Sequence, residues 1–339
     1  MKRIREFLLV AVATLALVAP LADAQEKVVV SELNWTGARA ISYVLKAVIE
    51  QRLGGQVEIK GGDPAVVFAG MDKGDGGIDV YSDLWMPSQA EKWAEYIDKR
   101  KTVETNAVPY KGIQRLWVPG YIQDTYNVRS IDDLKRPEII KLFDPEGSGK
   151  AKYFPGVPGW NITNIWQVKF QSYGLDKYWE GQAVDQNIML NRLDAAYKKK
   201  QPILFYYYTP EWAHVAYDLR PLDEPKFTGY ARPEDKANPL YNPNGCFAMY
   251  QPKDRPDWLE ASKVTCAMPD AQVWVAFSKS LEKRAPKSAK FLKQVQFTPD
   301  MINQWILDIG RDKKDPQDVA EGWVKRNKQI VDGWLKGVV

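Results

Sequence analysis

Histidine and cysteine are scarce in this chain. Among its 339 residues His214 is the only histidine, and Cys246 and Cys266 are the only cysteines. A single histidine and the lack of any C-x-x-C pair exclude a Cys/His metal centre. The sequence also has no G-x-S-x-G, P-loop or H-E-x-x-H motif. We therefore expect no bound metal, no cofactor and no enzymatic activity.

Charge of one sign is not concentrated anywhere in the sequence. There are 47 basic and 43 acidic residues, with a formal net charge of +4 and no long basic run. A nucleic-acid-binding protein usually shows a basic patch or stripe. The composition therefore argues against a nucleic-acid partner.

The sequence has no apolar run long enough for a good membrane span. The run at 7–18 is shorter than the roughly 20 residues that a spanning helix needs. Basic residues precede it and an A-x-A site follows at 22–24, which is the pattern of a secretory signal peptide. A retained anchor is the alternative. We expect residues 1–24 to be a signal peptide and the mature protein to be periplasmic, without a lipid anchor because no cysteine lies near the cleavage site.

Export bears on the state of the two cysteines. In an oxidising compartment Cys246 and Cys266 would close a loop of about 20 residues, which stabilises a fold by on the order of 3 kcal/mol. Two buried free thiols are the alternative. The sequence favours a disulfide.

The first hundred residues alternate between strand and helix patterns. Strand-like runs at 28–30, 57–59 and 78–81 are separated by a helix that Gly54 ends and by a helix at 64–71. This rhythm predicts an α/β fold with a mostly parallel sheet.

The length of the mature chain predicts two lobes. Roughly 315 residues exceed the size of one typical domain. Strands at 112–121 and 272–277 would take the chain out of the first lobe and back. We expect lobe I to comprise residues 25–115 and 270–339, and lobe II residues 116–269, including a long loop at 224–269 with both cysteines.

Three segments place an aromatic residue between a strand and a helix. The aromatic residues are Trp85, Trp160 and Tyr208. Ligands of open α/β folds bind just outside the carboxyl ends of strands, and aromatic faces attract cations. A capping box predicts that one of the helices starts at Ser88, and Thr209 is the predicted N-cap of another.

The second of these segments also favours an anion. The amides of Asn161 and Ile162 would open a helix, where unpaired N–H groups bind negative charge. A zwitterion with a bulky cation at one end fits the combination. Trp35, Asp83 and Trp212 are secondary candidates for ligand contacts, and packing in the core is the alternative role for every aromatic residue named.

Two other functions are compatible with these segments. An exported enzyme for an amine or aromatic substrate would have to use Asp83, Glu211 or the neighbouring tyrosines. A receptor of the same fold could bind a polyamine or another solute. Both lack the evidence of a dedicated motif.

Several longer motifs resemble one family. LKRPEIIKLFDPEGSGKAK, PGVPGW, FYYYTPEW and DPQDVAEGWVKRNKQIVDGWL are similar to segments of the glycine betaine/proline betaine substrate-binding proteins of bacterial ABC importers, the OpuAC-like family, and stand in the same order. The resemblance implies a two-lobed periplasmic binding protein, of the venus-flytrap type, with the ligand in the interlobe cleft.

The resemblance also implies a ligand, partners and site residues. Glycine betaine would be the first ligand to test, followed by choline, carnitine and other betaines, and the partners would be a membrane permease and its ATPase. Trp85, Trp160 and Tyr208 would box the trimethylammonium group, and the Asn161 and Ile162 amides would hold the carboxylate. Tyr208 stands where close relatives often have tryptophan. The protein would act as a monomer.

Overall fold

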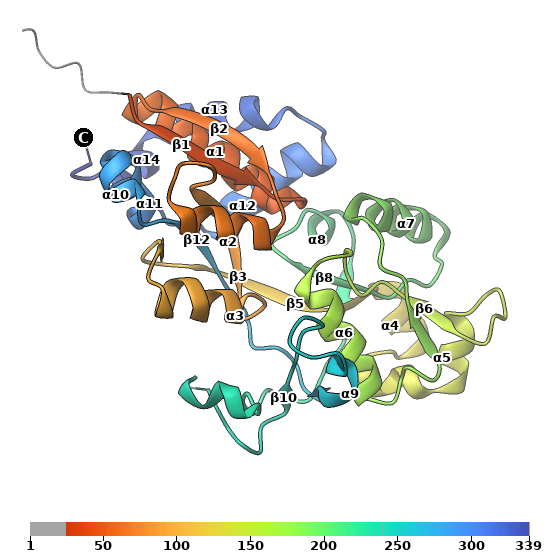
Figure 1. Ribbon diagram of the computed structural model, residues 1–339. Coiled ribbons are helices and arrows are strands. Elements are labelled where there is room, and N and C mark those ends of the chain that lie inside the picture. The colour runs from red at the N-terminus through yellow and green to blue at the C-terminus, as the bar shows by residue number, and fades with distance from the viewer. Residues whose placement is uncertain (1–24, 239, 339) are drawn as a thin grey trace, which may run out of the picture.

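The protein has two lobes joined by extended strands. The computed structural model describes residues 25–238 and 240–338, so the predicted signal peptide lies outside the described residues. Figure 1 shows that the beginning and the end of the described chain lie in the same lobe, whereas the middle of the chain forms the other. This lobe is called lobe I below and the other lobe II.

Lobe I begins with the strand and helix alternation that the sequence predicts. Its first elements are β1 (Lys27–Glu32), α1 (Thr36–Leu53), β2 (Gln56–Gly61), α2 (Pro64–Lys73) and β3 (Val80–Met86). Helix α1 ends where Gly54 adopts a left-handed conformation, and α2 begins where the Asp63 side chain accepts the Val66 N–H. Strands β2 and β3 pair with β1 in parallel.

The sheet as a whole is mixed rather than mostly parallel. Its order is β2-β1-β3-β12-β5-β8, and β12 (Ala271–Ser278) runs antiparallel to both β3 and β5. The prediction of a mostly parallel sheet was therefore wrong beyond the first three strands. The reason is that β12 is contributed by the returning chain, whose direction the local pattern of residues 28–81 does not contain.

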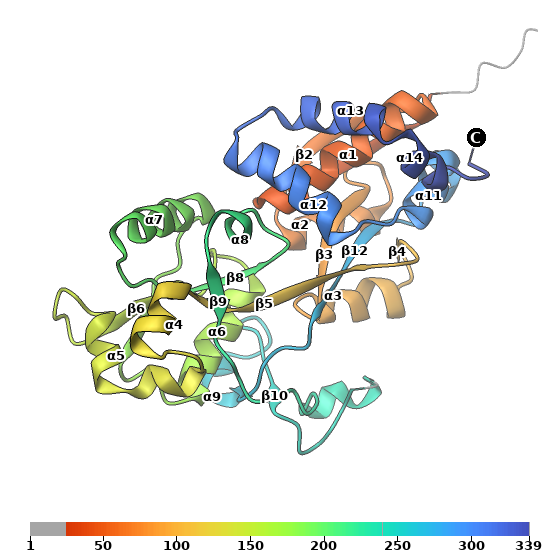
Figure 2. The same cartoon turned by 180° about the vertical axis from the view of Figure 1, so that it is seen from behind.

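Strand β5 (Tyr110–Pro119) belongs to both lobes. Its start pairs with β12 of lobe I, at Tyr110, Lys111 and Gly112. Its next residues, Ile113 to Trp117, pair with β8 (Phe205–Thr209) of lobe II. Figure 2 shows β5 running across the middle of the molecule, with β12 beside it as the chain returns to lobe I.

Lobe II packs its helices around a smaller set of strands. Its elements are α4 (Gly120–Tyr126), the 3₁₀ helix Ile131–Lys135, α5 (Pro137–Leu142), β6 (Ala151–Tyr153), α6 (Asn161–Ser172), β7 (Trp179–Gly181), α7 (Gln186–Lys199), α8 (Ala213–Ala216) and β9 (Leu219–Pro221). Strand β9 pairs with β5, and β6 pairs with β7 in parallel.

The hydrophobic cores follow the two lobes. One cluster contains only residues between 116 and 268, and two others contain only residues at 28–110 and 271–335. The exact boundaries at 115–116 and 269–270 stay a prediction. Within residues 25–238 and 240–338, no helix combines the length and the apolar character needed to cross a membrane.

The remaining helices of lobe I are more broken than their sequence patterns predict. After β3 come α3 (Ala90–Trp93), the π-helix Ala94–Lys99 and β4 (Val103–Thr105). After β12 come α10 (Leu281–Arg284), α11 (Pro286–Gln294), α12 (Pro299–Ile306), the π-helix Leu307–Arg311, α13 (Pro316–Arg326) and α14 (Lys328–Trp334). The sequence pattern at 279–294 predicts one helix, but the structure divides it before Pro286, because proline lacks the N–H that an uninterrupted helix needs.

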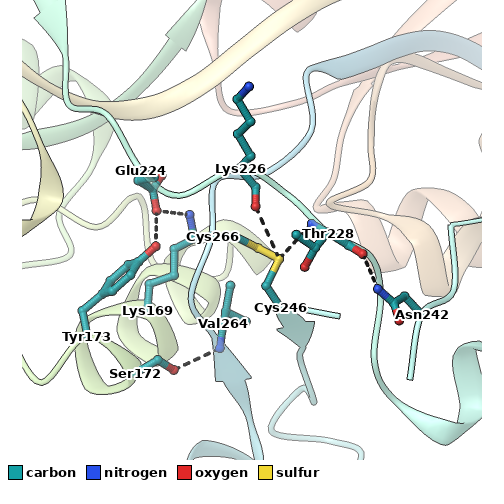
Figure 3. The surroundings of a disulfide bond; sticks show 10 residues. All are labelled: Lys169, Ser172, Tyr173, Glu224, Lys226, Thr228, Asn242, Cys246, Val264 and Cys266. Carbon is teal, nitrogen blue, oxygen red and sulfur yellow. Dashed lines mark hydrogen bonds and ion pairs between the residues drawn. A yellow bond between two sulfur atoms is a disulfide. The ribbon is translucent and has the colours of Figure 1, made fainter. Parts of the chain in front are cut away.

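The segment at 224–269 is tied down by a disulfide, as the sequence favours. Cys246 and Cys266 are bonded, with their Cα atoms 5.9 Å apart. Figure 3 shows the bond beside the short strand β11 and the end of α6. The segment contains the 3₁₀ helix Pro233–Ala237, β10 (Phe247–Ala248), α9 (Trp258–Ala261) and β11 (Lys263–Val264).

Candidate ligand-binding site

A hollow of about 450 Å³, part of it open to solvent, lies between the lobes. Residues of both lobes line it: Trp35, Pro64, Tyr81, Trp85, Ser88, Gln89, Gln114, Trp160, Asn161, Ile162, Tyr206 and Tyr208. No lysine, arginine, aspartate or glutamate of the described chain is in this set. Aromatic rings and neutral polar groups therefore form the walls.

Four aromatic rings form a connected cage in this hollow: Trp35, Trp85, Trp160 and Tyr208. The ring centroids of Trp85 and Tyr208 are 5.2 Å apart, and those of Trp160 and Tyr208 are 6.2 Å apart. Trp35 lies 5.7 Å from Trp160. The planes in these pairs are inclined by 60° to 82°, so the rings are walls facing different directions and not a stack. The structure thus brings together the three aromatic residues predicted from the strand–helix segments and Trp35, which was a secondary candidate.

Trp85 lies within strand β3, which is longer than the predicted run at 78–81. Directly opposite its ring, Gly112 of β5 has no side chain, and a Cβ there would come within 2.6 Å of the indole. Glycine at this position therefore leaves room for Trp85 between the two lobes.

The predicted helix start at Ser88 was wrong. The peptide bond between Met86 and Pro87 is cis, and α3 begins at Ala90 without a side-chain cap. The Ser88 hydroxyl lies 3.4 Å from the Gln114 amide, and the Ser88 carbonyl accepts the Asn161 side chain. The Ser88 hydroxyl, which would cap the helix, thus lies against β5 instead.

The predicted N-cap at Thr209 was also wrong. The Thr209–Pro210 peptide bond is cis, and α8 begins at Ala213 with Trp212 before it. Side chains alternate along β8, and Tyr206 and Tyr208, on the same face of the strand, both line the hollow. Trp212 is outside the lining set and packs against both lobes next to Gly310.

The segment before α6 is a turn that presents Trp160 to the cleft. The Trp160 N–H donates to the Val157 carbonyl over 3.1 Å, and Gly159 has φ of 87° after Pro158, which fits a type II turn. The Trp160 indole N–H donates to Asn34 (3.1 Å) and the Asn161 side chain donates to Ser88 (2.9 Å), so both residues link lobe II to lobe I.

Helix α6 begins at Asn161 as predicted. Asn161 and Ile162 line the hollow, and the first N–H groups of a helix have no partner within it. The Asn161 side chain is already bonded to Ser88, so its main chain and that of Ile162 are the groups of this turn that remain suited to an anion.

Asp83 lies behind the cage and not in its lining. Its side chain is fully buried. One oxygen accepts the indole N–H groups of Trp35 (2.5 Å) and Trp85 (3.1 Å), and the other accepts the Tyr110 hydroxyl (2.5 Å). Burial raises the pKa of Asp83, and these three hydrogen bonds oppose the rise. The carboxylate therefore orients two cage rings at once.

Glu211 is a second buried carboxyl group behind the cage, on the lobe II side. The Tyr208 hydroxyl lies 3.1 Å from the Gln186 side-chain oxygen and 3.5 Å from Glu211, and Gln186 donates to Glu211 over 3.3 Å. Burial raises the pKa of Glu211 from its ordinary value of 4.5 to about 7, although the Trp212 N–H and neighbouring side-chain donors oppose the rise.

We expect Glu211→Gln to gain stability relative to the wild type as the pH rises from about 4.5 to 8. Between its unfolded and folded pKa values the folded protein retains a proton that the unfolded chain has lost, so ionisation of Glu211 destabilises the wild type as the pH rises. The two pKa values correspond to a change of about 3 kcal/mol in the free energy of unfolding of the wild type relative to Glu211→Gln. Urea unfolding of both proteins across this range measures it, and parallel pH profiles would contradict it.

Several lining residues were missed in the sequence. Tyr81, Ser88, Gln89 and Gln114 line the hollow, and Tyr206 donates to Gln114 over 2.8 Å. Strand alternation was a usable signal for Tyr206, because it shares a strand face with Tyr208. Gln114 gave no local signal, since its role depends on β5 passing between the lobes. Among the described residues, no group of three or more His, Cys, Asp or Glu could hold a metal ion.

Comparison with known proteins gives the family. Residues 26–326 match the family described as "Substrate binding domain of ABC-type glycine betaine transport system", or OpuAC. The chain belongs to this family. Members of the OpuAC family are, by this description, substrate-binding domains and not enzymes.

Curated relatives align with part of the chain. The glycine betaine/proline betaine-binding periplasmic protein of Escherichia coli is 27% identical over 62% of this chain and 60% of its own length. The glycine betaine-binding periplasmic protein OusX of Dickeya dadantii is 25% identical over 64% of this chain and 63% of its own length. The chain thus covers less than two thirds of each of these two relatives.

Solved structures support the same two-lobed fold. A choline-binding protein of an ABC transporter, in complex with choline, has a TM-score of 0.67 at 22% identity and covers 92% of both chains. Lactococcal OpuAC, closed around glycine betaine, also has a TM-score of 0.67 at 22% identity, covering 92% of this chain and all of the other. At this identity the likeness establishes the OpuAC family fold.

Proposed function

We propose that this protein is the periplasmic substrate-binding protein of an ABC importer and that it captures a quaternary ammonium compound such as glycine betaine or choline. The observation that supports this most is the cage of Trp35 and Trp85 from lobe I and Trp160 and Tyr208 from lobe II, with no charged side chain in its lining. A quaternary ammonium group has no N–H to donate, so aromatic faces are its natural partners.

The two lobes give the cage a way to open and close. Because each lobe contributes rings, a ligand held by all of them stabilises the closed arrangement. The Asn161 and Ile162 amides would receive a carboxylate on the ligand, and the Ser88 and Gln114 side chains a hydroxyl. The closed protein would deliver the ligand, as a monomer, to a membrane permease driven by an ATPase.

Calorimetric titration of the purified mature protein with glycine betaine, choline and carnitine tests the proposal. We expect saturable one-to-one binding of at least one of them, and recovery of the ligand unchanged by mass spectrometry. A polyamine such as spermidine should not compete. Absence of binding by every quaternary ammonium compound, or chemical turnover of the ligand, would contradict the proposed function.

A further inference from the structure

The buried Asp83 carboxylate is hydrogen-bonded to two walls of the cage. Asp83 accepts hydrogen bonds from both indoles of lobe I, Trp35 and Trp85, and from the Tyr110 hydroxyl. All three donors are neutral. They hold the carboxylate in place without cancelling its charge.

No positively charged side chain of the described residues lines the hollow in front of Asp83. The lining of the hollow contains no lysine or arginine of the described chain, and the opposite lobe contributes a second buried carboxyl group, Glu211, behind Tyr208. An indole that donates its N–H to an anion is also polarised toward a more negative ring face, which strengthens its attraction for a cation. Asp83 therefore biases the potential on the lobe I side of the cage toward a cation.

We propose that Asp83 makes the cage select ligands with net positive charge, such as quaternary ammonium alcohols, over zwitterionic betaines with the same head group. The buried charge attracts the ammonium group of both kinds of ligand. It also repels the carboxylate of a betaine, for which the hollow supplies only neutral donors. Asp83 thus acts on the ligand through its electric field and by orienting Trp35 and Trp85. It is a positioning residue that also determines specificity. This inference rests on the proposed function.

Asp83→Asn separates the charge from the positioning. The amide oxygen can still accept both indole N–H groups, and the amide N–H₂ can donate to the Tyr110 hydroxyl, which can act as an acceptor. We expect choline affinity to fall by on the order of tenfold and glycine betaine affinity to change by less than threefold. Tyr110→Phe, which removes a donor but keeps the charge, should leave the choline-to-betaine affinity ratio unchanged or raise it.

A ligand series on the wild type gives the same test without a variant. We expect affinity to fall in the order choline, glycine betaine, 3,3-dimethylbutan-1-ol, the last being an uncharged analogue of choline. Glycine betaine binding as tightly as choline, or an equal loss for both ligands in Asp83→Asn, would overturn the inference while leaving the proposed function standing. Failure of the wild type to bind either ammonium compound would overturn both.

Discussion

Trp85→Ala should weaken the binding of choline and glycine betaine by about a hundredfold. A desolvated cation–π contact is worth about 2 kcal/mol. The ring also lies at edge-to-face distance from Tyr208 of the opposite lobe, 5.2 Å between centroids, so its removal takes away a contact that favours closure. Together these losses approach the roughly 2.7 kcal/mol that a hundredfold change in affinity requires. Calorimetry with each ligand measures the effect.

A matched control is available in the same lobe. Trp93 is a half-buried tryptophan on α3 that packs against Trp274, 5.5 Å between centroids, and it does not line the hollow. Trp93→Ala should leave both affinities within twofold of the wild type. If Trp85→Ala folds with a normal thermal transition and still binds within tenfold of the wild type, the assignment of the cage is wrong.

Lys169→Met should destabilise the protein by about 3 to 5 kcal/mol. The Lys169 ammonium lies 2.6 Å from the Glu224 carboxylate, and the two side chains are 0% and 2% exposed. Figure 3 shows the pair beside the disulfide, with the Tyr173 hydroxyl donating to the same Glu224 oxygen over 3.0 Å. Removing one partner leaves the other charge buried without compensation, and such losses fall in this range. Urea unfolding measures the change.

Two further variants distinguish this explanation from a loss of packing. Lys169→Met combined with Glu224→Gln should recover most of the lost stability, because the amide is neutral and can still accept the Tyr173 hydroxyl. Lys253→Met removes a lysine from an ion pair with Glu91 whose partners are 51% and 47% exposed, and it should cost less than about 1 kcal/mol. A double variant as unstable as Lys169→Met alone would show that the charge is not the cause.

Local sequence signals predicted the elements whose ends are determined by neighbouring residues. Gly54 ends α1 in a left-handed conformation, and α6 begins at Asn161 after a turn. The sequence pattern at 130–142 is helical apart from an interruption at Pro137, and Ser130 forms a capping box with Asp133 at the start of the 3₁₀ helix in this segment. These ends depend on hydrogen bonds within a few residues, which a sequence pattern contains directly.

The same kind of signal failed at the two cis prolines. Ser88 and Thr209 both looked like caps, but turns follow β3 and β8, and the helices begin only at Ala90 and Ala213. Positions around the site are determined by segments far apart in the sequence, as with Gly112 of β5 opposite Trp85 of β3. The role of Asp83 was likewise open, because nothing in the sequence reveals that Trp35 and Tyr110 share its carboxylate.

Strand β5 also determines which changes of chain length the protein can tolerate. Side chains alternate along a strand, so deleting one residue moves every following side chain to the other face. Strand β5 pairs with β12 of lobe I up to Gly112 and with β8 of lobe II from Ile113 onward. Gly112 faces Trp85, and Gln114 contacts Tyr206. A single-codon deletion between these two residues would bring Arg115 to the position of Gln114 at the cage. We expect insertions and deletions to be far better tolerated in the surface loops than at this one crossing, where a single lost codon alters both lobes and the site together.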